Sequence, residues 1–111
     1  MAEVFKNAYH DVTSSAAQAY LAPAGKTVVV LSLRIANVNA TATDYINAEV
    51  IDSDTTTKAF LAKEVDVPFD SVLELAGSSK IVLEAGDKIE LQGGQSSGYL
   101  EAHISVLEID N

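Results

Sequence analysis

The side chains best suited to acid–base chemistry are two histidines, His10 and His103, and both lie in stretches that alternate like β-strands. Histidine titrates near neutral pH and is the most frequent general acid or base in enzymes. A hydrolytic triad also needs an activated nucleophile, and no nucleophile-elbow pattern accompanies either histidine. We therefore expect no catalytic residue and no enzyme activity.

Asp52 and Asp54 are separated by one residue, with Asp44 nearby, which is a spacing found in calcium-binding loops. Such loops also need a glycine at the turn and a distal glutamate, whereas three threonines follow Asp54. Cysteine is absent, which excludes a thiolate zinc site and a disulfide framework. The sequence predicts no metal site and no cofactor.

Two other patterns suggest a phosphate-binding loop and a glycosidase site, but the rest of the sequence does not support either one. Ala24-Gly25-Lys26-Thr27 ends like a phosphate-binding loop, but Tyr20 stands where the first glycine belongs, and a strand follows instead of a helix. Four glutamates could pair as acid and base in glycoside hydrolysis, but they alternate along strands, which predicts a solvent-facing row. These glutamates are Glu84, Glu90, Glu101 and Glu108.

Length and charge restrict the classes of function. The chain has 111 residues, which predicts one domain spanning residues 1–111. The formal net charge is −9, which argues against partners that carry phosphates, so we expect neither nucleic-acid binding nor docking on an anionic membrane. Apolar residues make up 48% of the chain, enough for a folded core.

Period-two alternation and turn residues predict about eight short strands and no amphipathic helix. The expected strands fall within residues 4–12, 14–22, 27–38, 46–51, 58–65, 72–75, 81–84, 88–91 and 99–109, and the segment 14–22 is an Ala-rich stretch that could also form a short helix. Ala85-Gly86-Asp87 predicts a tight hairpin between two of them. The fold class is therefore all-β, a single β-sandwich of mostly antiparallel strands, Ig-like or jelly-roll-like.

The predicted core consists of large aliphatic side chains on one face of each strand. Its members are Leu31, Leu33, Ile46, Val50, Leu83, Ile89, Leu91, Leu100 and Ile104. Five further apolar residues fall on the opposite, outward faces, where polar residues are expected. These candidate interface residues are Val28, Val30, Ile51, Leu107 and Ile109. The alternative is a β-bulge, which shifts the alternation by one residue and turns such side chains inward.

Several stretches are typical of one group of proteins. They are Val4-Phe5-Lys6-Asn7-Ala8, Ala22-Pro23-Ala24-Gly25-Lys26-Thr27, Ala36-Asn37-Val38, the segment 80–87 and the segment 104–109. Together they make the chain resemble small virion proteins of tailed bacteriophages over nearly its whole length. The resemblance implies a β-sandwich component of the virion, made in the cytoplasm of the host bacterium, at the capsid, neck or tail.

Three readings of function follow. The first is a non-enzymatic capsid decoration or cement protein, or a neck or tail accessory, that self-associates and binds other virion proteins. The resemblance implies three-fold and six-fold sites, which favour a trimer. The second is a carbohydrate- or host-surface-binding module of a phage fibre, which exposed aromatic platforms would favour. The third is an enzyme, which would need a pocket of converging titratable groups.

Overall fold

The structure is a computed structural model that describes residues 2–54, 58–77, 79–95 and 98–111. These residues form nine strands and no helix, and therefore no helix that could cross a membrane. The strands are β1 (Glu3–Val12), β2 (Ala17–Leu21), β3 (Lys26–Asn37), β4 (Asp44–Ile51), β5 (Lys58–Val67), β6 (Val72–Glu74), β7 (Ile81–Leu83), β8 (Lys88–Gly93) and β9 (Leu100–Asp110). The all-β prediction is confirmed, and the Ala-rich segment contains a strand.

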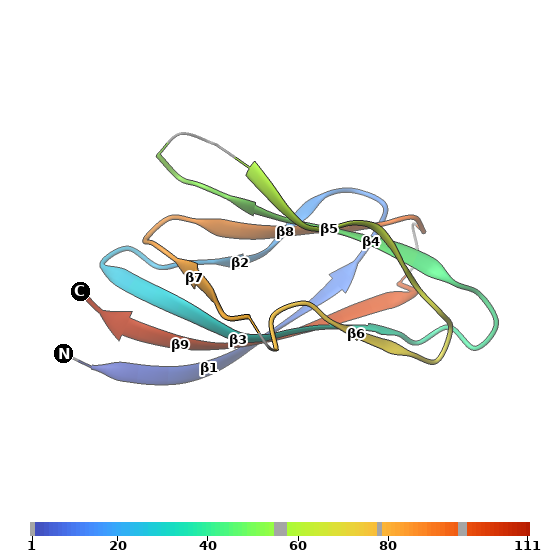
Figure 1. The fold of residues 1–111 in the computed structure, drawn as a ribbon, viewed down its shortest axis with the longest axis horizontal. Helices are drawn as coiled ribbons and strands as arrows, with labels where there is room; N and C mark the ends of the chain where they lie inside the picture. Colours follow the sequence, from blue (N-terminus) through green and yellow to red (C-terminus); the bar gives the residue numbers. More distant parts are fainter. Residues whose placement is uncertain (1, 55–57, 78, 96–97) are drawn as a thin grey trace.

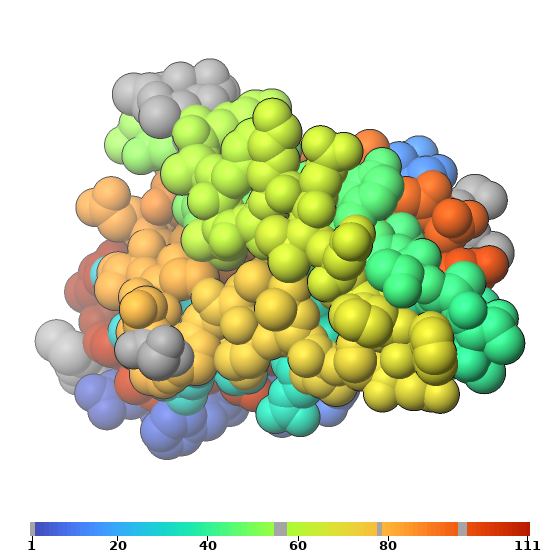
Figure 2. Space-filling view, turned by 45° about the vertical axis from the view of Figure 1, so that its right-hand side comes forward, coloured from blue at the N-terminus to red at the C-terminus, as the bar shows by residue number. Residues whose placement is uncertain are grey.

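The strands form two antiparallel sheets that face each other (Figure 1). The five-stranded sheet has the order β1-β9-β3-β6, and β7 also pairs with β3. The four-stranded sheet has the order β2-β8-β4-β5. On the side that Figure 2 shows, β5 and residues 68–77, which include β6, form a continuous surface across both sheets. The arrangement is a β-sandwich, as the alternation predicted.

The core lies between the sheets and contains most of the residues predicted for it. Seven of the nine are fully buried: Leu33, Ile46, Leu83, Ile89, Leu91, Leu100 and Ile104. Val50 is half-buried against the same cluster, and Leu31 is half-buried. Because side chains alternate along a strand, burying one face leaves the other face of each sheet outside.

A bulge in β3 corrects part of the predicted interface. The pairing of β3 with β9 shifts between Val30 and Ser32, so that Leu31 is the extra residue. Before the bulge the even-numbered side chains point inward, and Val28 and Val30 are fully buried in the core. The prediction that these two valines face outward is therefore wrong, and the bulge is the physical reason.

The predicted hairpin at residues 84–88 is also wrong, although the turn itself is present. The strand before it, β7, pairs with β3, whereas β8 pairs with β2 and β4 in the other sheet. Gly86 has a φ of +88°, and Asp87 accepts hydrogen bonds from the backbone amides of Glu84 (2.9 Å) and Ser53 (3.1 Å). The turn therefore carries the chain from one sheet to the other.

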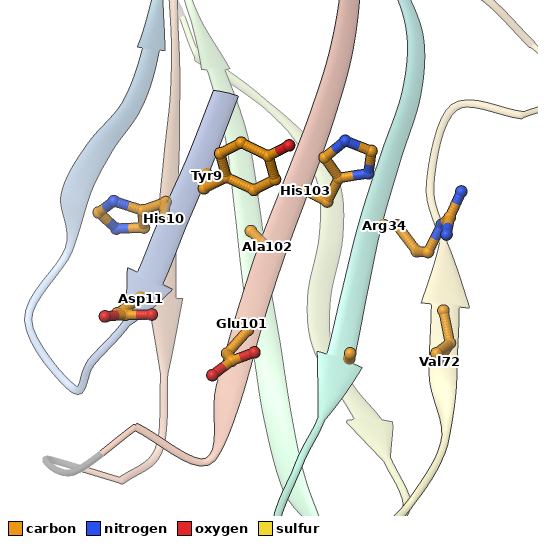
Figure 3. A pocket seen from close by; sticks show the side chains of 9 residues that line it. Tyr9, His10, Asp11, Arg34, Val72, Glu101, Ala102 and His103 are labelled. Atoms are coloured by element: carbon orange, nitrogen blue, oxygen red, sulfur yellow. The ribbon is translucent and has the colours of Figure 1, made fainter. Parts of the chain in front are cut away.

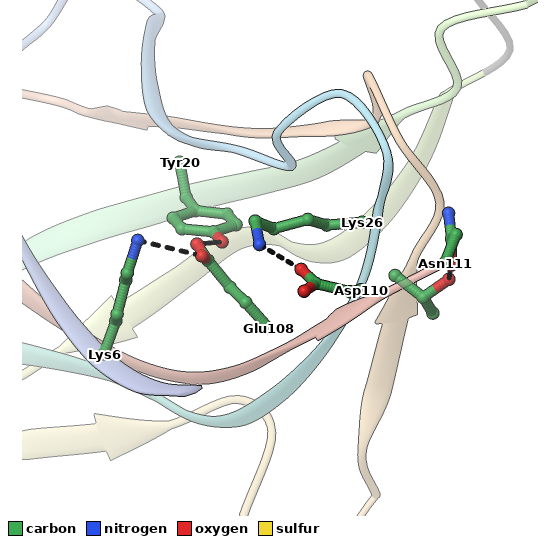
Figure 4. Close-up of polar contacts among 7 residues, drawn as sticks. Lys6, Tyr20, Lys26, Glu108, Asp110 and Asn111 are labelled. Carbon is green, nitrogen blue, oxygen red and sulfur yellow. Dashed lines mark hydrogen bonds and ion pairs between the residues drawn. The ribbon is translucent and has the colours of Figure 1, made fainter. Parts of the chain in front are cut away.

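Glu108 departs from the predicted row of outward glutamates. The even-numbered residues of β9 point into the sandwich, so Glu108 is buried, whereas Glu84 and Glu101 are exposed. Its carboxylate meets the hydroxyl of Tyr20 and the ammonium of Lys6, and an ion pair between Lys26 and Asp110 lies alongside (Figure 4). These contacts form a polar cluster at the end of the sandwich that holds both chain termini (Figure 1).

Candidate functional site

The outer face of the five-stranded sheet is the candidate functional site. We define the outer face as the side chains of β1, β9, β3, β6 and β7 that point away from the four-stranded sheet. The strand register arranges them in rows that cross the sheet, since residues directly opposite each other in antiparallel strands share a face. The side chains of this face are all exposed or half-buried.

One row of the outer face is entirely apolar. Phe5 is paired with Leu107, Leu107 with Val29, and Val29 with Val82, which places four apolar side chains across four neighbouring strands. Phe5 is 74% exposed and Val82 is 59% exposed, while Leu107 and Val29 are half-buried. We call these four residues the apolar row. An open sheet face is normally polar, so a continuous apolar strip across it indicates a contact surface.

The opposite end of the outer face is polar and hollowed (Figure 3). The hollow has a volume of about 450 Å³. Its lining comes from β1, β9, β3 and β6 and consists of Tyr9, His10, Asp11, Arg34, Ala36, Val72, Glu101, Ala102 and His103. We call this feature the hollow.

Tyr9 and His103 are stacked beside the hollow. Their ring centroids lie 5.1 Å apart with an angle of 18° between the ring planes. The Nε2 atom of His103 lies 3.2 Å from Oδ1 of Asn7, and the hydroxyl of Ser105 donates to the same oxygen at 3.0 Å. Tyr9 is nevertheless 75% exposed, so the pair is held in place while one ring remains open to solvent.

Three charged side chains at the hollow make no hydrogen bond or ion pair with another described residue. Asp11 and Glu101 stand directly opposite each other on β1 and β9, which places two carboxylates side by side. Like charges at such positions destabilise a sheet. Neither carboxylate, nor the guanidinium of Arg34, makes a hydrogen bond or ion pair with another described residue. These groups are therefore free to bind a ligand.

Glu74, which stands opposite Arg34 on β6, makes no ion pair with it, but the two opposite charges attract each other. Its carboxylate accepts hydrogen bonds from the hydroxyl of Ser32 (2.5 Å) and the amides of Leu33 (2.8 Å) and Ala76 (3.0 Å). Partial burial raises the pKa of Glu74, but these hydrogen bonds and the charge of Arg34 outweigh it, so the pKa lies below its ordinary value. Glu74 therefore stays charged and fixes the β3–β6 edge.

The histidines do not form a catalytic arrangement with the described residues. His103 contacts an amide oxygen and a tyrosine ring, neither of which is a nucleophile. His10 lies on the opposite side of β1 from Tyr9, and its Nε2 atom is buried without a hydrogen-bond partner in the described chain. A triad needs a nucleophile within hydrogen-bond reach of the base.

The carboxylates around Asp52 do not come together in the way that the spacing of Asp52 and Asp54 suggests. Asp52 accepts a hydrogen bond from the amide of Asp54 at 2.7 Å, which is a local turn contact. The carboxylates that meet within 4.8 Å of one another are those of Asp52, Glu84 and Asp87. Both oxygens of Asp87 already accept backbone hydrogen bonds, so we interpret this group as the support of a turn. The threonines after Asp54 lie outside the described residues.

The candidate interface residues separate into two groups. Leu107 and Ile109 are half-buried on the outer face, as expected. Val28 and Val30 are in the core, and Ile51 is only 6% exposed beside a second hollow of about 320 Å³ on the four-stranded sheet. Those three residues offer almost no surface to a partner, so their assignment to an interface is corrected.

Sequence reasoning missed the remaining members of the outer face. Phe5, Val29 and Val82 were not recognised as parts of a row, and Tyr9 was not paired with His103, because both relationships depend on the register between strands distant in the chain. The signal that could have found them is the alternation of β1, which places Phe5 and Tyr9 on one face.

Comparison of the chain with models of known protein families and with curated proteins found no match.

Proposed function

We propose that the chain is a non-enzymatic structural protein of a bacteriophage particle, a capsid decoration or cement protein or a neck or tail accessory. In this role it self-associates and binds other virion proteins. The observation that carries the proposal is the apolar row, which crosses four strands on an uncovered sheet face. The resemblance of the sequence to small virion proteins supports the choice of particle.

Leaving the apolar row in contact with water costs free energy. Burying apolar surface stabilises an association by roughly 25 cal/mol per Å². Phe5 and Val82 are both mostly exposed in the monomer, so a partner seated on this row would remove much of their surface from water. The half-buried Ile109 extends the strip from Leu107 along β9. A partner with its own apolar surface fits this part of the outer face.

We propose a homo-oligomer, with a trimer as the favoured state. A ring with three-fold symmetry matches the three-fold and six-fold sites of the particles that the resemblance implies. The net charge of −9 keeps assembled units from clumping through their remaining surfaces. We propose no role for a nucleic acid, a membrane, a cofactor or a metal.

The experiment that tests this role is mass spectrometry of purified particles from the phage that encodes the chain, followed by electron cryomicroscopy. We expect the protein in the particle in a copy number set by a symmetric site, with the outer face of the five-stranded sheet in contact with another subunit. A protein found in the infected cell but missing from the particle would contradict the proposal.

A further inference from the structure

The stacked pair at the hollow is an aromatic platform. One face of the Tyr9 ring packs against His103, and the sheet ends at β1, so no described strand flanks the ring on its other side. Cross-strand stacking and the hydrogen bond between His103 and Asn7 hold the platform in one orientation before any ligand binds. A preformed aromatic surface contributes contact area with little loss of conformational entropy.

Each ring of the platform has a carboxylate beside it on the same strand. Asp11 follows Tyr9 by two residues on β1, and Glu101 precedes His103 by two residues on β9, so all four side chains share the outer face. Side chains two residues apart on a strand lie about 7 Å from each other. Arg34 on β3 lies on the far side of His103 from Tyr9, and its side chain points toward β6 (Figure 3). Hydrogen-bond acceptors therefore lie beside the open ring, and the cation lies at the opposite side of the hollow.

This combination suits a ligand with an apolar face and a rim of hydroxyl groups. The weakly polar C–H face of a sugar ring packs on an aromatic ring, and its hydroxyls donate to carboxylates and accept from a guanidinium. A volume of about 450 Å³ lies within the range of small-ligand pockets and accommodates one or two sugar rings. Two carboxylates against one guanidinium leave the hollow with a negative charge, which disfavours an anionic sugar.

We propose that the hollow is a binding site for neutral carbohydrate, in which a pyranose ring packs on Tyr9 and its hydroxyls bind Asp11 and Glu101, with Arg34 at the far side of the hollow. The site goes beyond the proposed structural role and does not depend on it. Phe5 and Tyr9 are four residues apart on β1, about 13 Å along the strand. A partner seated on the apolar row can therefore leave the hollow open.

The test is NMR titration of the whole protein with the methyl glycosides of glucose, galactose, mannose and N-acetylglucosamine, in buffer that contains a chelator. Glucuronic acid is the anionic comparison. We expect at least one neutral glycoside to bind saturably with a Kd on the order of 1 mM, as a shallow one-sided site allows. Tyr9→Ala and Glu101→Gln should each raise that Kd by roughly tenfold or more, and glucuronic acid should bind more weakly than glucose.

Phe60→Ala is the matched control, because Phe60 is an exposed aromatic residue with Lys63 over its ring, but on the other sheet. It should leave the Kd unchanged. The proposal is overturned if none of the neutral glycosides binds saturably, if Tyr9→Ala binds as tightly as the wild type, or if glucuronic acid binds as well as glucose. None of these results bears on self-association through the apolar row, which is measured separately.

Discussion

Tyr20 on β2 donates a 2.6 Å hydrogen bond to the carboxylate of Glu108 on β9, and this contact joins the two sheets (Figure 4). Glu108 is only 3% exposed, and the ammonium of Lys6 lies 3.0 Å from its second oxygen. Burial and the hydrogen bond to Glu108 raise the pKa of Tyr20 well above its ordinary value. A buried carboxylate stays charged at this position because two partners compensate for lost hydration.

Tyr20→Phe removes the hydroxyl and should lower the free energy of unfolding by about 1.5–3 kcal/mol, the range for a hydrogen bond to a charged group. Urea unfolding measures this loss. Tyr45→Phe is the control, because the Tyr45 hydroxyl has no hydrogen-bond partner among the described residues, and it should change stability by less than about 0.5 kcal/mol. Equal effects of the two changes would show that the contact does not hold the sheets together.

Acid should remove the contribution of Glu108. Burial raises its pKa, but the hydrogen bonds from Tyr20 and Lys6 and the charges of Lys6 and Lys26 outweigh that effect, so the folded-state pKa lies below the ordinary value of 4.5. The unfolded chain then binds the proton more readily. The stabilisation is therefore fully present above pH 4.5 and is lost as the pH falls through the folded-state pKa.

The measurement is the free energy of unfolding of the wild type and of Glu108→Gln across this pH range, because glutamine occupies similar space without titrating. We expect the wild type to lose stability relative to Glu108→Gln as the pH falls below 4.5. A difference that stays constant into strong acid, or that moves the other way, would mean that the folded-state pKa is not lowered.

The bulge in β3 predicts different costs for two neighbouring leucines. Leu33→Ala empties a fully buried position and should cost about 2–5 kcal/mol. Leu31 is the half-buried bulge residue, so Leu31→Ala should cost less than half as much in the same urea experiment. A larger loss for Leu31→Ala than for Leu33→Ala would mean that the inward and outward faces of β3 are assigned the wrong way round.

The strands could be predicted from the sequence, but their faces and partners only in part. Alternation is informative where one face is polar, as in the first half of β9, where Glu101, His103 and Ser105 face outward, and there the inward residues Leu100 and Ile104 are as predicted. Val28 to Leu31 are all apolar, so the pattern before the bulge fits either face. The turn at Gly86 could be recognised locally, whereas the sheet that each neighbouring strand joins depends on tertiary packing.

The candidate site was less accessible to sequence reasoning, because its elements come from strands far apart in the chain. Leu107 and Ile109 could be identified as outward and apolar on their own strand. The pairing of Leu107 with Phe5, and of Tyr9 with His103, follows from the β1–β9 register, and nothing in either segment fixes that register. The inward position of Glu108 could have been found from the alternation of β9, which puts it on the face of Leu100 and Ile104, whereas its partner Tyr20 on the opposite sheet could not.

Sedimentation velocity of the wild type and of Leu107→Asp over a range of protein concentrations tests self-association through the apolar row most directly. An unpaired charge in a buried contact is strongly destabilising. The wild type should form an oligomer, with the mass of a trimer as the favoured outcome, and Leu107→Asp should sediment as a monomer. Phe60→Asp, which changes an exposed position on the other sheet (52% exposed), should behave like the wild type. A wild type that remains monomeric at the highest concentration, or Leu107→Asp that associates as the wild type does, would contradict the account.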